Sequence, residues 1–225
     1  MKRYVFLDTE TSGLCDFWDY ICQLSYLVTD KDLNVIETKN FYFYVPEVGR
    51  EAISVHGLTP DILKKLSGGK KFEDFADEIV EDLKNAELVI CHNAEFDLGF
   101  VRYALEAVEK YRGKTQINNN YFCTMEAYTD ILQIPHRYYK VKYPRLEEVI
   151  DYLNVTDDDI KKVIDNSFGE SRGYHDSRYD VACTYIIYKK YLNLDIEKVQ
   201  EENERKRKEE ANRRVETPIY DEPPF

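Results

Sequence analysis

The chain has 225 residues, of which 43% are hydrophobic and 14% aromatic, so it can build a substantial core and a wholly disordered protein is excluded. Its 43 acidic and 31 basic residues give a net charge of −12, which at first argues against nucleic-acid binding, since phosphate binding relies on cations. No apolar run approaches the ~18–20 residues of a membrane-spanning helix, and we expect neither a span nor a secretory leader. The five scattered cysteines predict free thiols in a reducing compartment, the cytoplasm.

The order of the predicted elements indicates an α/β domain. The segments with strand-like patterns are 3–9, 21–30, 34–45, 87–92 and 121–124. The segments with helical periodicity are 71–84, 94–110, 124–132, 145–153, 158–167 and 177–192. The first three strands predict an antiparallel meander because a very short turn joins the second to the third. The strands come first along the chain, and helices and strands alternate after them. This order predicts a mixed sheet flanked by helices.

The end of the chain differs in kind from the rest. Residues 197–214 carry charges almost continuously, and three prolines follow. Such a segment is a solvated helix or a disordered arm. We therefore expect a folded domain over 1–195 and a charged, extended or disordered tail over 196–225.

Two acids stand at the end of the first strand. Asp8 and Glu10 follow the apolar run YVFL, and residues i and i+2 of a strand share a face, so both carboxylates point the same way. By itself the pair is a weak signal, because about eight triplets with an acid at both ends arise by chance in a chain so rich in acids. A solvated strand end explains it equally. Its place at the carboxyl end of a buried strand, however, is where α/β sheets collect their sites.

Two later segments add acids and a histidine. Asp97 lies in the first turn of the helix after the strand at 87–92, where it could simply serve the helix dipole. His175 and Asp180 lie five positions apart, which is about 140° around a helix. A shared site therefore requires His175 on the loop before the helix, with Asp176 or Ser177 as cap. Four clustered carboxylates repel one another and predict divalent cations, Mg²⁺ or Mn²⁺. Two such ions beside a histidine base predict phosphodiester hydrolysis.

The same segments resemble the motifs of a known family. FLDTETSGL (6–14), HNAEFDLGFV (92–101) and YHDSRYD (174–180) look like the three exonuclease motifs of the DEDD superfamily, in the DEDDh branch that includes the proofreading epsilon subunits of bacterial DNA polymerase. The motifs occur in order, and the resemblance covers residues 3–192. It implies a ribonuclease-H-like exonuclease fold. It also implies a 3′→5′ exonuclease that releases nucleoside 5′-monophosphates from single-stranded or frayed DNA, in proofreading or repair.

The resemblance implies a role for each motif position. It makes His175 the general base and assigns two divalent cations to the ligands Asp8, Glu10, Asp97 and Asp180. The segment SVHGLTPDI (54–62) resembles the family's terminal-nucleotide loop, so the residues implied in substrate binding are Thr11, Leu14, His56 and Phe96. Core packing is the alternative for Phe96, and a loop anchor for Leu14. Asp176 is a local departure, an extra acid beside the base.

The segment HRYYKVKYPR (136–145) predicts where a single strand of nucleic acid would lie. Its cations are Arg137, Lys140, Lys142 and Arg145, with three tyrosines interleaved and no acid among them. Cations meet phosphates and aromatic rings stack on bases. The alternative is a solvated loop whose tyrosines pack on the core. The charged tail would tether a partner such as a polymerase subunit, or serve solubility alone.

Other functions remain open from the sequence. An exoribonuclease or oligoribonuclease would use the same motifs, because the 2′-hydroxyl is read by details of the pocket. A catalytically silent nucleic-acid-binding module and a phosphatase for free nucleotides are further alternatives. The net charge excludes none of the nucleic-acid functions. Residues 197–225 account for −2 of it, and four of the remaining ten charges belong to the acids that two divalent ions would neutralise.

Overall fold

The computed structural model describes residues 3–114 and 117–216. Its strands are β1 (Arg3–Thr11), β2 (Ile21–Thr29), β3 (Val35–Tyr42), β4 (Ala86–Cys91) and β5 (Tyr121–Cys123). Its helices are α1 (Arg50–His56), α2 (Pro60–Ser67), α3 (Ala76–Asn85), α4 (Ala94–Ala107), α5 (Thr124–Leu132), α6 (Leu146–Tyr152), α7 (Asp157–Ser167), α8 (Ser177–Tyr191) and α9 (Ile196–Glu216), with a 3-10 turn at Phe72–Asp74. Each predicted strand is present. The predicted helix at 71–84 is divided between the 3-10 turn and α3, and α1 and α2 were not predicted.

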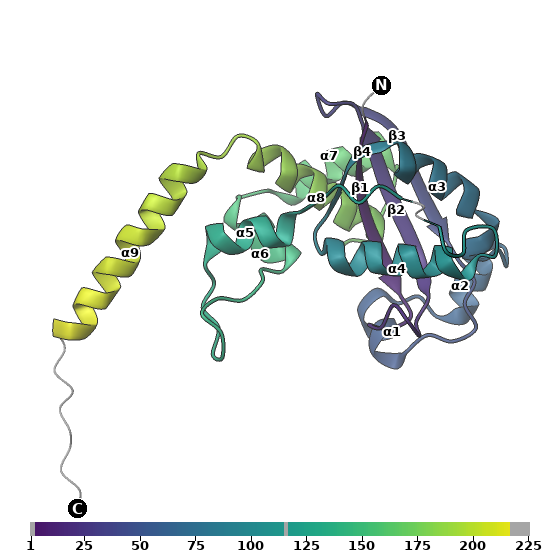
Figure 1. Ribbon diagram of the computed structural model, residues 1–225, viewed down its shortest axis with the longest axis horizontal. Coiled ribbons are helices and arrows are strands. Elements are labelled where there is room, and N and C mark those ends of the chain that lie inside the picture. The colour runs from purple at the N-terminus through teal and green to yellow at the C-terminus, as the bar shows by residue number, and fades with distance from the viewer. Residues whose placement is uncertain (1–2, 115–116, 217–225) are drawn as a thin grey trace, which may run out of the picture.

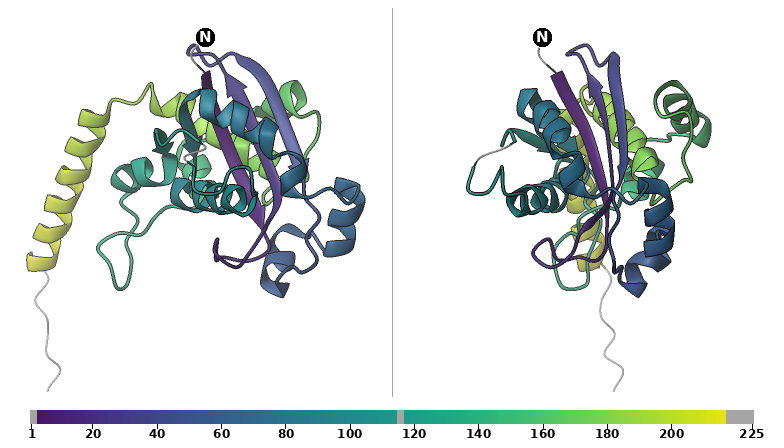
Figure 2. Two further views of the ribbon diagram at one scale, coloured as in Figure 1. Left: turned by 45° about the vertical axis from the view of Figure 1, so that its right-hand side comes forward. Right: turned by 90° about the vertical axis from the view of Figure 1, so that its right-hand side faces the viewer.

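The five strands form one mixed sheet in the order β3-β2-β1-β4-β5. The first three strands pair antiparallel, which confirms the meander, while β1 pairs parallel with β4 and β4 with β5. Figure 2 shows the sheet between two helical layers, with α3 and α4 on one face and α7 and α8 on the other. The chain therefore has the predicted α/β architecture, with β1 at the centre.

The alternation of side chains along β1 determines which layer each residue meets. Val5 and Leu7 are fully buried in the core shared with α3 and α4, whereas Phe6 is buried in the core shared with α8. Because the period of a strand is two residues, Asp8 and Glu10 continue the Phe6 face, towards α8.

The helices α8 and α4 differ in how their N-termini are capped. Asp176 precedes α8 and caps it, since its carboxylate accepts a hydrogen bond from the Arg178 backbone N–H at 3.2 Å. This agrees with the cap predicted there. Asn93 precedes α4, but its side chain makes no capping hydrogen bond. Asn93 thus occupies the N-cap position of α4 without a side-chain cap, and its side chain lines a cavity instead.

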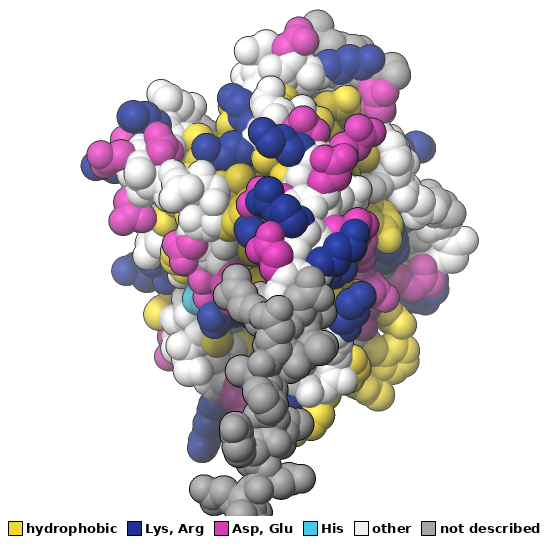
Figure 3. Space-filling view, turned by 90° about the vertical axis from the view of Figure 1, so that its left-hand side faces the viewer, with side chains coloured by type: hydrophobic (Ala, Val, Ile, Leu, Met, Phe, Trp, Pro, Cys, Tyr) yellow, Lys and Arg dark blue, Asp and Glu magenta, His cyan; other side chains and the backbone are white. Residues whose placement is uncertain are grey.

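The charged segment predicted as a solvated helix or a disordered arm is the helix α9 in its described part. Residues 217–225 of the predicted tail lie outside the described residues. The Asn203 side-chain amide donates to the backbone oxygen of Ile131 at 2.9 Å, so the first half of α9 lies against α5. Beyond it α9 projects away from the sheet (Figure 1). Figure 3 shows Lys and Arg side chains intermixed with Asp and Glu on this side of the molecule.

All five cysteines are free thiols, as the sequence predicts. Within the described ranges, no helix combines the length and the apolar character that crossing a membrane requires.

Candidate active site

Carboxylates from three elements meet where β1 ends. Asp8 and Glu10 come from β1, Asp97 from the first turn of α4, and Asp180 from the first turn of α8. Glu10, Asp97 and Asp180 are buried. The structure thus brings together the four acids that the sequence predicts from separate motifs.

Burial raises the pKa of each of these acids, and repulsion between carboxylates raises the pKa of Asp8, Glu10 and Asp180 further. Loss of hydration is the larger of the two causes. The pKa of Glu10 rises to about 9 and that of Asp180 to about 8, while that of Asp8 lies well above its usual value. Burial raises the pKa of Asp97 only to about 7, because the Thr9 hydroxyl and backbone N–H donate to its Oδ1 at 2.8 and 3.1 Å. Without a cation, the cluster holds protons near neutral pH.

His175 completes the cluster from the loop before α8. Its backbone lies in the left-handed region, with φ at +64°, and its N–H donates to Asp180 Oδ2 at 3.1 Å. One ligand atom each from Glu10, His175 and Asp180 lies within 4.8 Å of the others. The His175 side chain is exposed, so a substrate can reach the imidazole.

These residues fit a divalent cation. Among the described residues, Asp180 Oδ1 is buried with no hydrogen-bond partner. A buried carboxylate oxygen left without a donor is costly, and a cation satisfies it. Oxygen-rich ligand sets favour hard cations such as Mg²⁺ or Mn²⁺.

Asp176 lies beside the cluster, yet donors already surround it. Its side chain is completely buried, and the Arg178 guanidinium donates to both carboxylate oxygens at 2.9 and 2.7 Å. The Gln23 amide adds a bond at 3.1 Å, and the Arg172 side chain another at 3.3 Å. Burial alone would raise the pKa of Asp176, but the bonds and charge of Arg178 keep it below its usual value. This extra acid therefore anchors the loop that carries His175.

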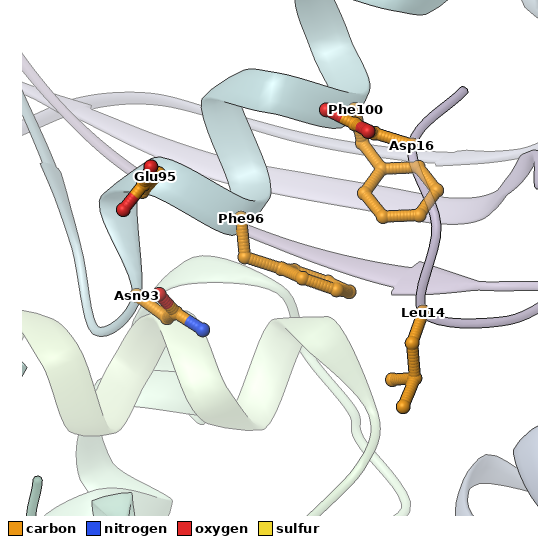
Figure 4. Close-up of a pocket in the computed structure, with 6 residues that line it drawn as sticks. All are labelled: Leu14, Asp16, Asn93, Glu95, Phe96 and Phe100. Atoms are coloured by element: carbon orange, nitrogen blue, oxygen red, sulfur yellow. The ribbon is translucent and has the colours of Figure 1, made fainter.

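A cavity of about 280 Å³ opens beside the start of α4. Its lining residues are Leu14, Asp16, Asn93, Glu95, Phe96 and Phe100. Figure 4 shows the Phe96 ring and the Leu14 side chain on opposite sides of this space. Leu14 is largely exposed and Phe96 is partly buried, so both present apolar surface to the cavity.

Thr11 and His56 meet each other rather than lining that cavity. Burial lowers the pKa of His56, which keeps the ring neutral. Its Nδ1 accepts a hydrogen bond from the Leu58 N–H at 3.0 Å, so Nε2 carries the proton and donates to the Thr11 oxygen at 3.0 Å. His56 thereby fixes the backbone at the end of β1.

Comparison with known proteins assigns the chain to a family. Residues 5–188 match the family model described as exonuclease (RNase T). The chain belongs to this exonuclease family. The family depends on divalent metal ions, in agreement with the acidic cluster.

Curated relatives from several bacteria carry the name DNA polymerase III subunit epsilon. The protein from Pasteurella multocida is 29% identical over 159 residues, which cover 68% of this chain and 58% of the relative. The protein from Escherichia coli is 30% identical over 154 residues, which cover 65% of this chain and 58% of the relative. The chain thus spans little more than half the length of these relatives.

The fold also resembles solved structures of exonuclease I. The Escherichia coli enzyme in complex with a dA16 oligonucleotide superposes with a TM-score of 0.63 at 19% identity, covering 89% of this chain and 42% of that one. The enzyme from Methylocaldum szegediense gives a TM-score of 0.60 at 20% identity, covering 84% of this chain and 41% of that one. Both comparisons show the same fold, in agreement with the predicted ribonuclease-H-like architecture.

The basic segment forms an exposed loop between α5 and α6. The tyrosines at its tip, Tyr138 and Tyr139, are exposed and do not pack on the core. Lys142 Nζ contacts Glu148 at 2.6 Å, and an Arg145 nitrogen lies 3.3 Å from Glu147, so acids pair with both cations. The Arg137 guanidinium lies over the Tyr138 ring at 5.6 Å.

Sequence reasoning missed several contributors to the site. Thr9 stands between the two predicted acids, but nothing in its own segment indicates that it donates to Asp97. Gln23 meets Asp176 across 153 residues of sequence, which no local pattern signals. Phe100 could have been found, because it follows Phe96 by four residues on the same face of α4.

Proposed function

We propose that this protein is a metal-dependent 3′→5′ exonuclease that releases nucleoside 5′-monophosphates from the 3′ end of single-stranded or frayed DNA, in proofreading or repair. The observation that carries the proposal is the approach of ligand atoms of Glu10, His175 and Asp180 to within 4.8 Å of one another, with Asp8 and Asp97 close enough for their charges to act on this group. We infer a cytoplasmic location from the free thiols.

The four acids would hold two divalent ions, Mg²⁺ or Mn²⁺. When bound, these ions supply positive charge at the attacked phosphate and at the leaving oxygen. His175 stands beside Glu10 and Asp180 and takes the proton of the attacking water. The water oxygen would bond to phosphorus while the bond from phosphorus to the 3′ oxygen of the preceding nucleotide breaks. That oxygen would take a proton from solvent to become the new 3′-hydroxyl, and the terminal nucleotide would leave with its 5′ phosphate.

The terminal nucleotide would occupy the cavity between Leu14 and Phe96. Apolar and aromatic side chains hold a base by contact with its faces, which suits an enzyme that removes any base. Thr11, held by His56, would meet the terminal sugar. Arg137 and Lys140 would meet the phosphates of the strand that leads to the site, and Lys142 would contribute less because it pairs with Glu148.

The choice of DNA rests on the relatives. Curated relatives are named as DNA polymerase subunits, and exonuclease I has been solved with DNA oligonucleotides. Association with a DNA polymerase subunit is part of the proposal on the same ground. Co-elution of the purified chain with a purified polymerase catalytic subunit would test that association, and separate elution would contradict it.

The activity itself is tested with 5′-labelled single-stranded DNA, duplex DNA and RNA, each with Mg²⁺, with Mn²⁺ or with chelator. We expect a ladder of products shortened one nucleotide at a time from the 3′ end. It should be absent with chelator and reduced at least about 100-fold by Asp8→Asn and by His175→Ala, since each residue acts on the reacting groups.

Asp165→Asn, which changes an exposed acid on α7, is the matched control and should leave the rate unchanged. Inertness of the wild type on all three substrates would reject the proposal. A preference for RNA would assign the site to an exoribonuclease.

A further inference from the structure

A cluster of exposed aromatic side chains lies on the loop that follows β1. Trp18 is 75% exposed, Phe17 58%, and Tyr103 on α4 42%. The Phe17 ring centroid lies 4.8 Å from that of Trp18 and 5.5 Å from that of Tyr103, both in edge-to-face geometry. Exposed aromatic rings in mutual contact, unlike apolar residues scattered singly over a surface, are typical of a binding surface.

The loop is ordered by its polar residues, which turn inwards. Asp19 accepts hydrogen bonds from the Ser12 hydroxyl at 3.2 Å and from the Cys15 N–H at 3.0 Å. The Ser12 backbone N–H donates to the Tyr20 oxygen at 2.8 Å, which closes the loop. A Cβ on Gly13 would stand 2.3 Å from the Asp19 carboxylate, so a side chain there would displace that carboxylate from its hydrogen bonds. The loop thus holds its rings towards solvent in a fixed conformation.

The cluster is continuous with the cavity proposed for the terminal nucleotide. Phe96, Phe100 and Tyr103 follow one another at i, i+4 and i+7, which places them along one stripe of α4. Phe96 and Phe100 line the cavity, and their ring centroids are 4.8 Å apart. Figure 4 shows the loop passing beside this stripe through Leu14 and Asp16. The loop approaches α4 closely at Gly99, since a Cβ there would stand 2.8 Å from the Asp16 carboxylate.

We propose that Phe17, Trp18 and Tyr103 form a stacking platform for a base of the single strand that lies 5′ of the terminal nucleotide. The inference rests on the proposed function, because it takes the cavity as the site of the 3′ end. A strand whose last base fills the cavity must continue across its rim, where the platform begins. Ring faces accept any base, and a platform that is already ordered loses little entropy on binding.

Trp18 provides a direct readout, because it is the chain's single tryptophan. Fluorescence excited at 295 nm is followed in the full-length Asp8→Asn chain with Mg²⁺, titrated with thymidine 5′-monophosphate and with oligothymidylates of two to six nucleotides. We expect saturable quenching by the oligonucleotides and none by the mononucleotide. In a set of oligonucleotides that each lack one base, we expect quenching to be lost when the missing base is at one particular position 5′ of the terminal nucleotide.

Kinetics separate the platform from the catalytic site. Trp18→Ala should raise KM for a hexanucleotide by about five- to tenfold and leave kcat within about twofold. Trp18→Phe, which keeps a ring, should restore most of the loss. Hydrolysis of the nitrophenyl ester of thymidine 5′-monophosphate, which has no second base, should be unchanged. Tyr121→Ala, an exposed aromatic outside the cavity and the loop, is the matched control.

The outcomes distinguish this inference from the proposed function. Normal degradation with no quenching, or quenching that no abasic position affects, would overturn the platform and leave the exonuclease in place. Failure of the wild type to hydrolyse any substrate would overturn the exonuclease, whereas base-dependent quenching would still support the platform. An unchanged KM in Trp18→Ala would mean that another partner covers these rings and would overturn the inference.

Discussion

Thr9 separates the two acids of β1 and makes both of its polar contacts with a third acid, Asp97. Its side chain lies on the face of the sheet opposite Asp8 and Glu10, so one strand supplies carboxylates to one side and a donor to the other. The hydroxyl and the backbone N–H both reach Asp97 Oδ1, which fixes the orientation of the Asp97 carboxylate. Thr9 is therefore an orienting residue for the metal site.

Thr9→Val should weaken the site without unfolding it. The backbone N–H still donates to Asp97, but loss of the hydroxyl raises the pKa of Asp97 further and frees its rotation. We expect the Mg²⁺ concentration for half-maximal activity to rise about 10-fold, with the rate recovered at high Mg²⁺. Thr29→Val on β2 is the matched control, because the buried Thr29 hydroxyl has no partner among the described residues. Equal Mg²⁺ dependence in both variants would contradict the assignment.

Asp176 and Arg178 form a buried pair next to His175. The carboxylate is inaccessible and the Arg178 side chain is only 10% exposed. Asp176→Asn keeps the shape but leaves the guanidinium without its counter-charge. Because breaking a buried pair strands the remaining charge, we expect a loss of about 3 kcal/mol in the free energy of unfolding, measured by urea denaturation. Glu202→Gln, which breaks an exposed pair with Lys206 on α9, should change the free energy of unfolding far less, because solvent screens an exposed pair. Equal costs would refute the buried-pair account.

At the scale of elements, strongly patterned segments could be predicted and short ones could not. The helix at α5 was predicted with its observed ends, because apolar spacing defines it. Helix α1 has seven residues and ends at Gly57 in the left-handed conformation, so its segment SVHG indicated a loop. The pairing of β1 with β2 was predicted as part of the meander, but the parallel pairing of β1 with β4, which places β1 at the centre, joins segments far apart in sequence and leaves no local trace.

The same distinction holds for the candidate site. Asp8, Glu10, Asp97, His175 and Asp180 could be found because each belongs to a compact motif. Contacts such as that between Gln23 and Asp176 could not, because they depend on strands and helices far apart in sequence. The cluster of Phe17, Trp18 and Tyr103 also escaped notice, because its members come from a loop and from a distant helix.

The loop between α5 and α6 contains two kinds of cation. Lys142 and Arg145 contact Glu148 and Glu147, whereas Arg137 lies at the exposed tip with Lys140. We expect Arg137→Ala with Lys140→Ala to weaken binding of single-stranded DNA and to reduce the slope of log Kd against log salt by about 1. Lys142→Ala with Arg145→Ala should change that slope by less than half as much, since acids already neutralise these cations. The measurement is a titration over a range of salt, and identical slopes for both double variants would contradict the division.

At the scale of the whole molecule, the acidic cluster makes stability depend on pH. Asp97, Asp180 and Glu10 have pKa values of about 7, 8 and 9 in the fold, far above those of an unfolded chain. The folded state therefore binds more protons than the unfolded state, and its stability falls as pH rises through this range. His92, whose pKa burial lowers to about 4, opposes this trend only below about pH 6.5.

Between pH 6.5 and 8.5 in chelator, we therefore expect the melting temperature to fall by about 5 °C. Glu10→Gln should flatten the fall, because it removes the group with the highest of the three values. Excess Mg²⁺ should reverse it by binding the ionised carboxylates. Glu126→Gln, an exposed carboxyl on α5, is the control. A melting temperature that rises with pH in chelator would contradict the raised values.

One helix, α4, carries Phe96 and Asp97 as neighbouring residues. The first lines the cavity and the second belongs to the acidic cluster. A ligand in the cavity and a cation at the cluster must therefore act on the same rigid segment, and their binding equilibria are linked. By reciprocity, any factor by which nucleoside monophosphate tightens metal binding equals the factor by which metal tightens nucleotide binding. Equilibrium dialysis of Mn²⁺ with and without the nucleotide would measure that factor, and we expect it to exceed one.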